Sequence, residues 1–224
     1  ASKSVIKMSP ADTVPVTVPQ YAGKTLIFDL DGTLADTMPV HYRAWVQALS
    51  AFGVADLFPE TRFYAMAGIP TYDISVTLCR EAEAEGRTLP SGCGCEEWDE
   101  APRLASQSRD DIYHALLESE GIPPRQAVVD IARAHHSICP MAVGTGSCRH
   151  SANKTLKALG IETLFGSVVC SEDYTHPKPH PQCFTTAADN LGAVYSECIV
   201  FEDSDLGLKA ARDAGMQGVD VRGM

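Results

Sequence analysis

The chain has 224 residues, of which 45% are hydrophobic and 21% charged, a composition typical of a globular protein that buries a substantial core. Its formal net charge of −11 argues against nucleic acid and anionic membrane surfaces as partners. Its apolar runs are far shorter than the roughly 18 to 20 residues of a membrane-spanning helix, and residues 1–23 contain no apolar stretch typical of a secretory signal. We therefore expect a cytoplasmic or organelle-stromal protein, in which residues 1–23 are an N-terminal extension outside the fold.

The first predicted strand is an apolar run that begins near Leu26 and ends in two carboxylates, Asp29 and Asp31, followed by Gly32. A short apolar run that stops at glycine is typical of a buried strand. Ligands of an open parallel sheet bind beyond the carboxyl ends of its strands, and Gly32 allows the chain to turn sharply there. One aspartate could simply cap a following helix, but two of them in this position favour a reaction site.

Residues 38–119 differ in character from the rest of the chain. Apolar residues at helical spacing predict a helix over 37–52, and charged, helix-forming segments follow at 72–85 and 101–119. Segments rich in glycine and proline join them, and no strand is predicted between them. We therefore expect an all-helical cap, inserted after the first strand.

Strands and helices alternate regularly in the last part of the chain. The predicted strands are 139–145, 167–170, 198–201 and 217–221, and the predicted helices are 127–135, 151–159, 181–191 and 206–214. Glycine just past a helix is the usual stop signal, and Gly160, Gly192 and Gly215 occupy such positions. The alternation predicts a doubly wound, Rossmann-like α/β core, formed by residues 24–37 and 120–224 around a parallel sheet covered on both faces.

The eight cysteines show no paired Cys-x-x-Cys spacing with matching histidines, so they do not predict a zinc site. Cys139, Cys170 and Cys198 lie in or beside apolar runs, and we expect them to be buried as small hydrophobic side chains. Cys93 and Cys95 lie close together in a loop rich in glycine, proline and serine. For this pair we favour a plain, reduced loop over a disulfide or a metal site.

Two polar motifs follow later elements of the predicted core. Thr145 and Gly146 stand at the end of the second core strand, ahead of a helix whose free amides attract anions. Taken alone, Thr145 could equally be a helix cap. Lys178 lies between two prolines in a rigid loop. Because a solvated surface lysine has no need of such rigid neighbours, we favour a functional role for it.

Glu202 and Asp203 repeat the pattern of the first strand, since an apolar strand again ends in adjacent carboxylates. If these two strands are neighbours in the sheet, Asp29 and Asp203 converge on one point. Several carboxylates at one point repel each other strongly unless a cation lies among them. Either Glu202 or Asp205 could instead be a supporting partner or a helix cap.

The chain resembles the haloacid dehalogenase superfamily in four motifs that occur in the same order and context, FDLDGTLADT, MAVGTGS, HPKPHP and VFEDSDLG. The resemblance covers about residues 24–222 and is greatest to the β-phosphoglucomutase-like branch of sugar-phosphate phosphatases and mutases. In that branch the cap is inserted after the first motif, and a Thr and a His, here Thr37 and His41, mark the hinge into the cap. The stretches MAVGTGS, at residues 141–147, and FEDSDLGLKAARDAGMQGVDVR, at residues 201–222, look especially like those of bacterial phosphatases acting on fructose 1-phosphate and 6-phosphogluconate.

The resemblance implies an aspartyl-phosphate mechanism, in which Asp29 is the nucleophile and Asp31 the general acid and base. It implies Mg²⁺ held by the Asp29 carboxylate, the main-chain carbonyl of Asp31 and Asp203, with Glu202 beside them; hard oxygen ligands and a phosphate substrate suit this ion. The residues implied to bind the substrate are Gly32, Thr37, His41, Thr145, Gly146 and Lys178. We expect a monomeric enzyme whose partner is a small phosphorylated metabolite.

Other activities on this fold were weighed against a phosphatase. A dehalogenase of this superfamily would lack Asp31, and a catalytically silent binding protein is expected to lack at least one motif residue. A phosphomutase would hold a second phosphate with a cap Arg and a later cap Lys. Here Thr71 stands where the Arg would be and Ser108 where the Lys would be, although Arg109 lies beside it. We therefore expect the phosphoryl group to pass to water rather than to another hydroxyl of the sugar.

Overall fold

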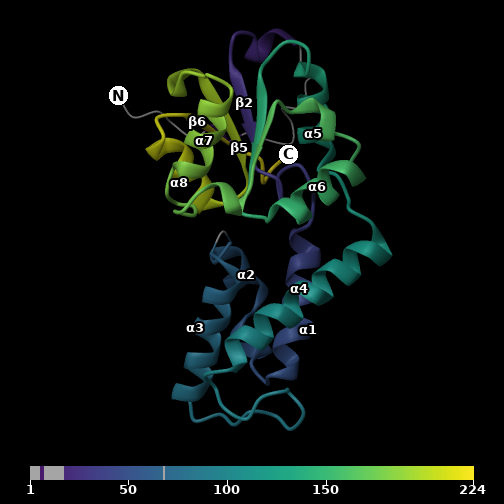
Figure 1. The fold of residues 1–224 in the computed structure, drawn as a ribbon, viewed down its shortest axis with the longest axis vertical. Helices are drawn as coiled ribbons and strands as arrows, with labels where there is room; N and C mark the ends of the chain where they lie inside the picture. The colour runs from purple at the N-terminus through teal and green to yellow at the C-terminus, as the bar shows by residue number, and fades with distance from the viewer. Residues whose placement is uncertain (1–5, 8–17, 68) are drawn as a thin grey trace. The chain divides into compact units, whose positions relative to one another are not determined.

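The structure, a computed structural model, describes residues 6–7, 18–67 and 69–224. The chain folds into two compact units. We call residues 1–36 with 122–224 the core unit and residues 37–121 the cap unit. Figure 1 shows a sheet flanked by helices in the core unit and helices α1 to α4 in the cap unit. None of the helices in the described ranges combines the length and the apolar character that a bilayer crossing requires.

The core unit is built on a six-stranded parallel sheet in the order β1-β6-β5-β2-β3-β4. Its strands are β1 (Ile6–Lys7), β2 (Thr25–Phe28), β3 (Met141–Gly144), β4 (Ser167–Val169), β5 (Cys198–Glu202) and β6 (Gln217–Asp220). Strands β2, β3 and β5 are buried along their whole length, as expected of central strands in a parallel sheet. Phe28 pairs with Val143 on one side and with Phe201 on the other, so the carboxyl ends of these strands lie level.

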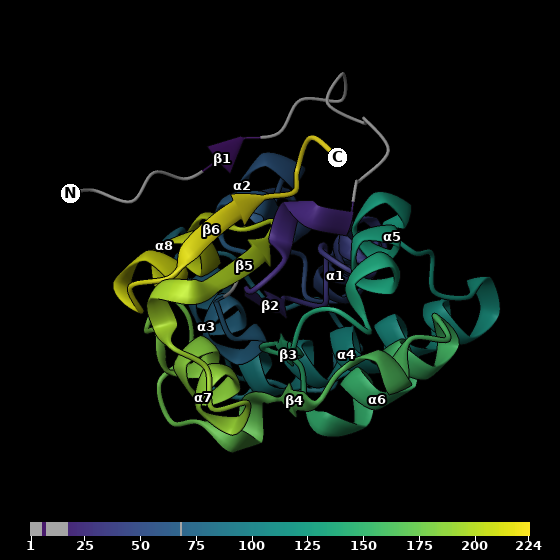
Figure 2. The same ribbon diagram turned by 90° about the horizontal axis from the view of Figure 1, so that it is seen from above.

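Helices cover both faces of the sheet. They are α5 (Gln126–His135), α6 (Arg149–Ala158), α7 (Gln182–Asn190) and α8 (Asp205–Asp213). Figure 2 shows α5 and α6 on one face and α7 and α8 on the other. Successive strand residues point to opposite faces, so Leu26 and Phe28 belong to one apolar cluster and Ile27 to the other. This arrangement confirms the doubly wound α/β core.

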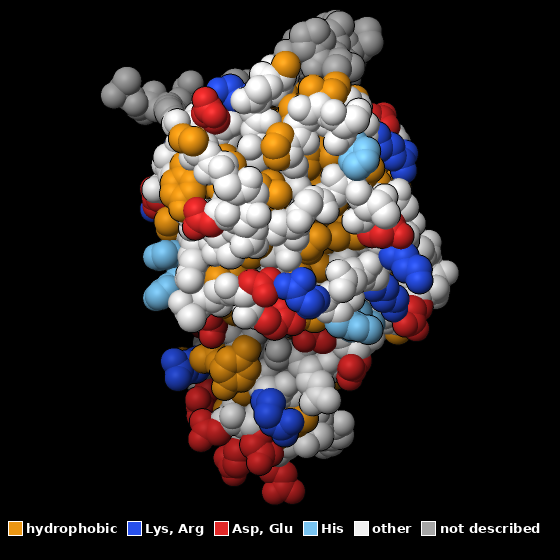
Figure 3. All heavy atoms as spheres, turned by 45° about the horizontal axis from the view of Figure 1, so that its top comes forward, with side chains coloured by type: hydrophobic (Ala, Val, Ile, Leu, Met, Phe, Trp, Pro, Cys, Tyr) orange, Lys and Arg blue, Asp and Glu red, His pale blue; other side chains and the backbone are white. Residues whose placement is uncertain are grey.

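The cap unit is all-helical and has one apolar cluster of its own. Its helices are α1 (Met38–Ala51), α2 (Glu60–Ala65), α3 (Thr71–Ala84) and α4 (Ala101–Glu120). Trp45, Phe58 and Leu78 are fully buried at the centre of the cluster. Helix α2 was not predicted, because six residues are too few for a helical repeat to show in the sequence. Figure 3 shows acidic side chains gathered over the end of the cap unit where α3 ends.

Short 3₁₀ turns complete the structure. They are η2 (Val18–Tyr21), η3 (Ala55–Leu57), η4 (Glu162–Leu164), η5 (Ser171–Asp173) and η6 (Tyr195–Glu197). Cys139, Cys170 and Cys198 are buried, which confirms the prediction made for them. All eight cysteines are free thiols.

The expectation that residues 1–23 lie outside the fold does not hold for the part of this stretch that the structure describes, residues 6–7 and 18–23. Strand β1 pairs with β6 at the edge of the sheet, and Tyr21 is only 6% exposed within the core cluster. The ring of Tyr21 lies 5.2 Å from that of His135 and 5.6 Å from that of Phe201, between centroids. Elements this short have no periodicity to read, so their burial depends on long-range packing that the sequence does not display.

Replacing Tyr21 by alanine should lower the free energy of unfolding by about 3 to 5 kcal/mol, the usual cost of removing a large buried aromatic side chain. The matched control is Tyr72→Ala, because the Tyr72 side chain is 52% exposed and its loss should cost less than about 0.5 kcal/mol. Urea denaturation followed by circular dichroism measures both. Equal effects of the two substitutions would show that Tyr21 is not part of the core.

Candidate active site

The carboxyl ends of β2 and β5 bring three carboxylates together. Asp29 directly follows β2, Glu202 ends β5 and Asp203 is the next residue. One carboxylate oxygen from each of the three lies within 4.8 Å of the others. Strand β5 is the neighbour of β2, which is the condition under which the sequence predicted that Asp29 and Asp203 would converge.

Lys178 bridges two of these three carboxylates. Its Nζ donates hydrogen bonds to Oδ1 of Asp29 at 2.7 Å and to Oε2 of Glu202 at 2.8 Å. The residue is 8% exposed, and its ammonium group lies 4.6 Å from the centroid of the Phe184 ring. Burial alone would lower the pKa of Lys178, but Asp29 and Glu202 hold it well above its usual value. Lys178 is therefore a buried, protonated lysine rather than a solvated one.

Negative charge in the cluster exceeds what one lysine can balance. Burial and the charge of Glu202 raise the pKa of Asp29 to about 7, against the opposing effect of Lys178. Burial, Glu202 and Asp29 raise the pKa of Asp203 well above its usual value. A cation among these oxygens would favour their ionised forms. The donor set, made of carboxylate oxygens only, fits a hard divalent cation.

Glu202 also supports the start of helix α8. Its Oε1 accepts hydrogen bonds from the main-chain nitrogen of Ser204 at 2.9 Å and from the Ser204 hydroxyl at 2.7 Å. Ser204 is the N-cap of α8 and accepts a bond from the Gly207 nitrogen. A Cβ at Gly207 would lie 2.1 Å from Cδ of Glu202, so only glycine fits beside it. The exposed side chain of Asp205 pairs with Arg222 instead. Of the two residues weighed as supporting partners, Glu202 has the supporting contacts.

Gly32 leaves room for Asp203. Its φ of +89° is a conformation that residues with side chains rarely adopt, and a Cβ there would lie 2.1 Å from Oδ2 of Asp203. The hydroxyl of Thr33 donates to Oδ1 of the same carboxylate at 3.3 Å. The turn after β2 therefore approaches Asp203 closely through Gly32 and orients it through Thr33.

The second motif contacts Asp31 through a residue that the sequence analysis missed. The hydroxyl of Ser147 donates to Oδ2 of Asp31 at 2.6 Å, and its main-chain nitrogen donates to the Thr145 hydroxyl at 3.0 Å. Thr145 is buried and does not cap α6, whose N-cap is Cys148. A Cβ at Gly146 would meet nothing within 4 Å, so the loop is open at that point. Because Ser147 ends the same motif, its position two residues after Thr145 was the available signal.

Thr37 and His41 belong to the cap unit. Thr37 is fully buried and its carbonyl accepts a bond from the His41 nitrogen at 2.9 Å. The His41 ring stacks on Tyr113 with 4.0 Å between centroids, and its Nδ1 contacts Nη2 of Arg109. Arg109 is only 8% exposed and has a buried Nε with no partner. The sequence had placed Arg109 only as a neighbour of Ser108.

Replacing Lys178 by methionine should lower the free energy of unfolding by about 3 to 5 kcal/mol, because two buried carboxylates lose their partner. The control is Lys209→Met, since Lys209 forms an exposed pair with Asp213 and such pairs contribute little. Chemical denaturation of both variants at neutral pH measures the difference. If Lys178→Met were as stable as the control, the buried pairs would not hold the cluster together.

Comparisons of the sequence and the structure with those of known proteins identify relatives of this chain. The family model for haloacid dehalogenase-like hydrolases matches residues 24–215. Fructose-1-phosphate phosphatase YqaB of Escherichia coli strain K12 is 36% identical over 204 residues, which cover 91% of this chain and 97% of that protein. Beta-phosphoglucomutase of Bacillus subtilis strain 168 is 26% identical over 203 residues, covering 88% and 83%.

A crystal structure of a hydrolase from Pseudomonas syringae superposes with a TM-score of 0.68 at 26% identity, covering 88% of this chain and 84% of that one. The sheet order, the carboxylate cluster around Lys178 and the family match agree with one another. The chain belongs to the haloacid dehalogenase-like hydrolase family.

Proposed function

We propose that this enzyme is a Mg²⁺-dependent phosphatase that hydrolyses a small sugar phosphate through an aspartyl-phosphate. The observation that carries the proposal is the bridge formed by Lys178 between Asp29 and Glu202, with Asp203 beside it. The E. coli relative is named as a fructose-1-phosphate phosphatase and covers nearly the whole chain. Fructose 1-phosphate is therefore the first substrate to test.

Asp29 is held in place for attack on phosphorus. Lys178 donates to Oδ1 of Asp29 and thereby fixes the orientation of the buried carboxylate. Covalent attack divides one difficult hydrolysis into two easier steps. Because Lys178 stays protonated, it also offsets charge on the transferring phosphoryl group. Thr145 and Gly146, ahead of α6, are the proposed contacts for the phosphate oxygens.

Asp31 is the proposed proton carrier. Ser147 donates to one of its oxygens and thereby orients the carboxyl group. Asp31 protonates the leaving sugar oxygen and then takes a proton from the water that attacks the aspartyl-phosphate. Thr37 and His41 remain the proposed contacts of the cap unit with the substrate.

The proposed metal ligands are the carboxylates of Asp29 and Asp203 and the main-chain carbonyl of Asp31. When bound, Mg²⁺ supplies positive charge that offsets the charge of the phosphoryl group. Glu202 already gives Oε2 to Lys178 and Oε1 to Ser204, so its proposed role is to hold Lys178 at the edge of the metal site. We also propose a cytoplasmic monomer without nucleic-acid or membrane partners, in keeping with the net charge of −11.

The contacts of Arg109 favour a phosphatase over a mutase, which would transfer the phosphoryl group to another hydroxyl of the sugar. A mutase needs cations to hold a second phosphate, and Thr71 and Ser108 carry no charge. The Arg109 guanidinium bonds to Asp110 at 2.7 Å and lies 5.6 Å from the centroid of the Trp45 ring. It is thus engaged inside the cap unit, and a second phosphate has little to bind.

The first test is phosphate release from fructose 1-phosphate and other sugar phosphates. We expect turnover with Mg²⁺ and loss of turnover in excess chelator, restored when Mg²⁺ is added back, because the carboxylates would otherwise repel a phosphate dianion. Colorimetric phosphate detection measures both. Full turnover in excess chelator would contradict the metal assignment.

Asp31→Asn should slow turnover of sugar phosphates by about 10²- to 10⁴-fold, the usual contribution of a positioned proton donor. The loss should be smaller for an aryl phosphate, whose leaving group needs no proton. Asp130→Asn is the control, since Asp130 is exposed and bonds to Gln126 on α5. Equal losses on both kinds of substrate would remove Asp31 from the role of general acid.

Supplying β-glucose 1-phosphate with a bisphosphate primer separates hydrolysis from mutase activity. Because Thr71 and Ser108 stand where a mutase would carry its two phosphate-binding cations, we expect inorganic phosphate to form faster than glucose 6-phosphate. Coupled assays for the two products measure the ratio. Faster formation of glucose 6-phosphate would identify a mutase.

A further inference from the structure

The loop between α3 and α4 carries two thiols that the phosphatase chemistry does not use. The Sγ atoms of Cys93 and Cys95 lie 3.7 Å apart, and the Cys93 thiol donates to the main-chain oxygen of Cys95 at 3.2 Å. A disulfide bond is about 2.05 Å long. The two sulfurs would therefore have to move about 1.7 Å closer to form the bond. We propose that Cys93 and Cys95 form a reversible disulfide by exchange with an incoming disulfide compound.

The residue between the two cysteines permits this approach. Gly94 has a φ of +91°, and a Cβ built there would meet only Leu104, at an ordinary contact distance of 3.8 Å. A larger side chain would therefore fit at this position, but the positive φ favours glycine. The turn at Gly94 holds Cys93 and Cys95 on the same side of the loop, where their sulfurs touch.

Exposure distinguishes this pair from the other cysteines. Cys93 and Cys95 are partly exposed, Cys148 is exposed on the core unit, and the remaining five are buried. Cys79 belongs to the apolar cluster of the cap unit and is 1% exposed. An exchange reagent therefore meets three thiols, and only two of them are neighbours.

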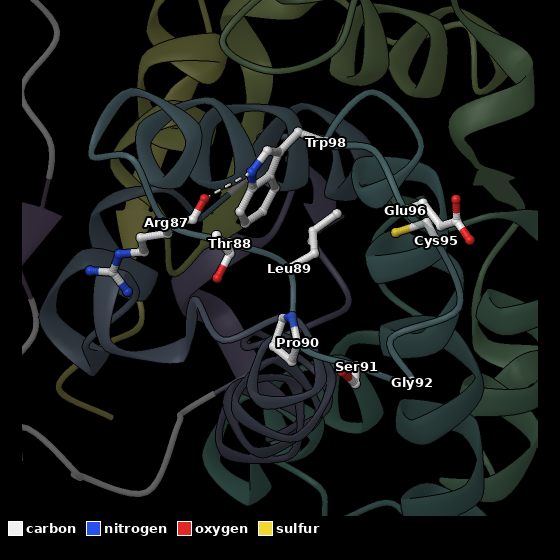
Figure 4. Close-up of a pocket in the computed structure, with 9 residues that line it drawn as sticks. All are labelled: Arg87, Thr88, Leu89, Pro90, Ser91, Gly92, Cys95, Glu96 and Trp98. Atoms are coloured by element: carbon white, nitrogen blue, oxygen red, sulfur yellow. Dashed lines mark hydrogen bonds between the residues drawn. The ribbon is translucent and has the colours of Figure 1, made fainter.

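A surface pocket gives access to Cys95. The pocket has a volume of about 530 Å³, and Cys95 is one of its lining residues. Figure 4 shows the Cys95 sulfur turned toward the side of the pocket formed by Leu89 and Trp98. The indole nitrogen of Trp98 donates to the main-chain oxygen of Arg87 at 3.3 Å, which ties the two ends of the pocket loop together. A small disulfide can therefore reach Cys95 without unfolding the loop.

A disulfide suits the pair better than a metal ion does. Within the described part of the chain, Asp29, Glu202 and Asp203 form the one group of three metal-binding side chains whose ligand atoms all lie within 4.8 Å of one another. Among the residues that the structure describes, the cysteine pair has no third such ligand at that range, whereas structural zinc sites use four. Bond formation between two sulfurs needs no further ligand.

The thiol–disulfide exchange takes place in two steps. The thiolate of one cysteine attacks a sulfur of the incoming disulfide, which gives a mixed disulfide and releases one thiol. The thiolate of the second cysteine then attacks the first Sγ and releases the other thiol. Two electrons pass to the incoming disulfide, and the two protons leave on the released thiols.

The surroundings of Cys95 set the conditions for the reaction. Burial, the contact with Cys93 and the charge of Glu100 raise the pKa of Cys95 to about 11, so the reaction should accelerate as the pH rises toward that value. Acidic side chains are exposed in the same loop at Glu96 and Glu97. A cationic disulfide should therefore react faster than an anionic one at low salt.

The test uses the full chain with Cys148→Ser, which leaves two accessible thiols, and the cationic disulfide cystamine. After treatment at about pH 8.5, the folded protein is labelled with N-ethylmaleimide and weighed intact by mass spectrometry. We expect two labels on the reduced protein and none after treatment. The treated protein should be about 2 Da lighter with no cysteamine attached, and dithiothreitol should restore both labels.

Cys93→Ser and Cys95→Ser in the same background are the matched controls. Each leaves a single loop thiol, so treatment should stop at one attached cysteamine. The proposal is overturned if the chain with both cysteines keeps two labels after treatment or retains a stable cysteamine adduct. The measurement does not depend on the proposed phosphatase activity, so either proposal can fail without the other.

Discussion

The buried bridge between Lys178, Asp29 and Glu202 is the interaction on which the rest of the site depends. Buried carboxylates without a partner are strongly destabilising, and Lys178 donates to both at 2.7 and 2.8 Å. Neighbouring elements are arranged around this bridge. Gly32 and Gly207 are the residues that leave room for the side chains of Asp203 and Glu202, where any Cβ would overlap them. The sheet, the close contacts at Gly32 and Gly207 and the buried Lys178 thus all help to position the carboxylate cluster.

Much of this site could be predicted from the sequence, because each motif follows a strand and parallel strands end at the same edge of a sheet. Asp29 and Asp203 were predicted to converge in this way, and the pairing of β5 with β2 brings them together. Lys178 was chosen instead for its rigid loop between prolines, and its side chain reaches Asp29 and Glu202. Ser147 was missed, because its bond to Asp31 joins residues 116 positions apart. The burial of Tyr21 was missed for the same reason, since its partners are distant in sequence and its own segment has no periodicity.

In the cap unit, too, contacts between residues distant in the sequence could not be predicted. Its helices were predicted from apolar spacing, but side-chain contacts between helices were not. Arg109 on α4 contacts His41 on α1 and lies over aromatic rings of both helices, and nothing in the spacing of either helix indicates this. The proximity of Cys93 and Cys95 was visible in the sequence, whereas the contact of their sulfurs depends on the backbone turn at Gly94.

The central claim is that Asp29 forms the covalent intermediate. It is tested most directly by rapid acid quenching of the enzyme with a sugar phosphate radiolabelled in its phosphate group, followed by peptide mapping. The account predicts label on the peptide that contains Asp29, lost at the rate of phosphate release and absent from Asp29→Asn. Turnover without protein-bound label, or label on another residue, would contradict it.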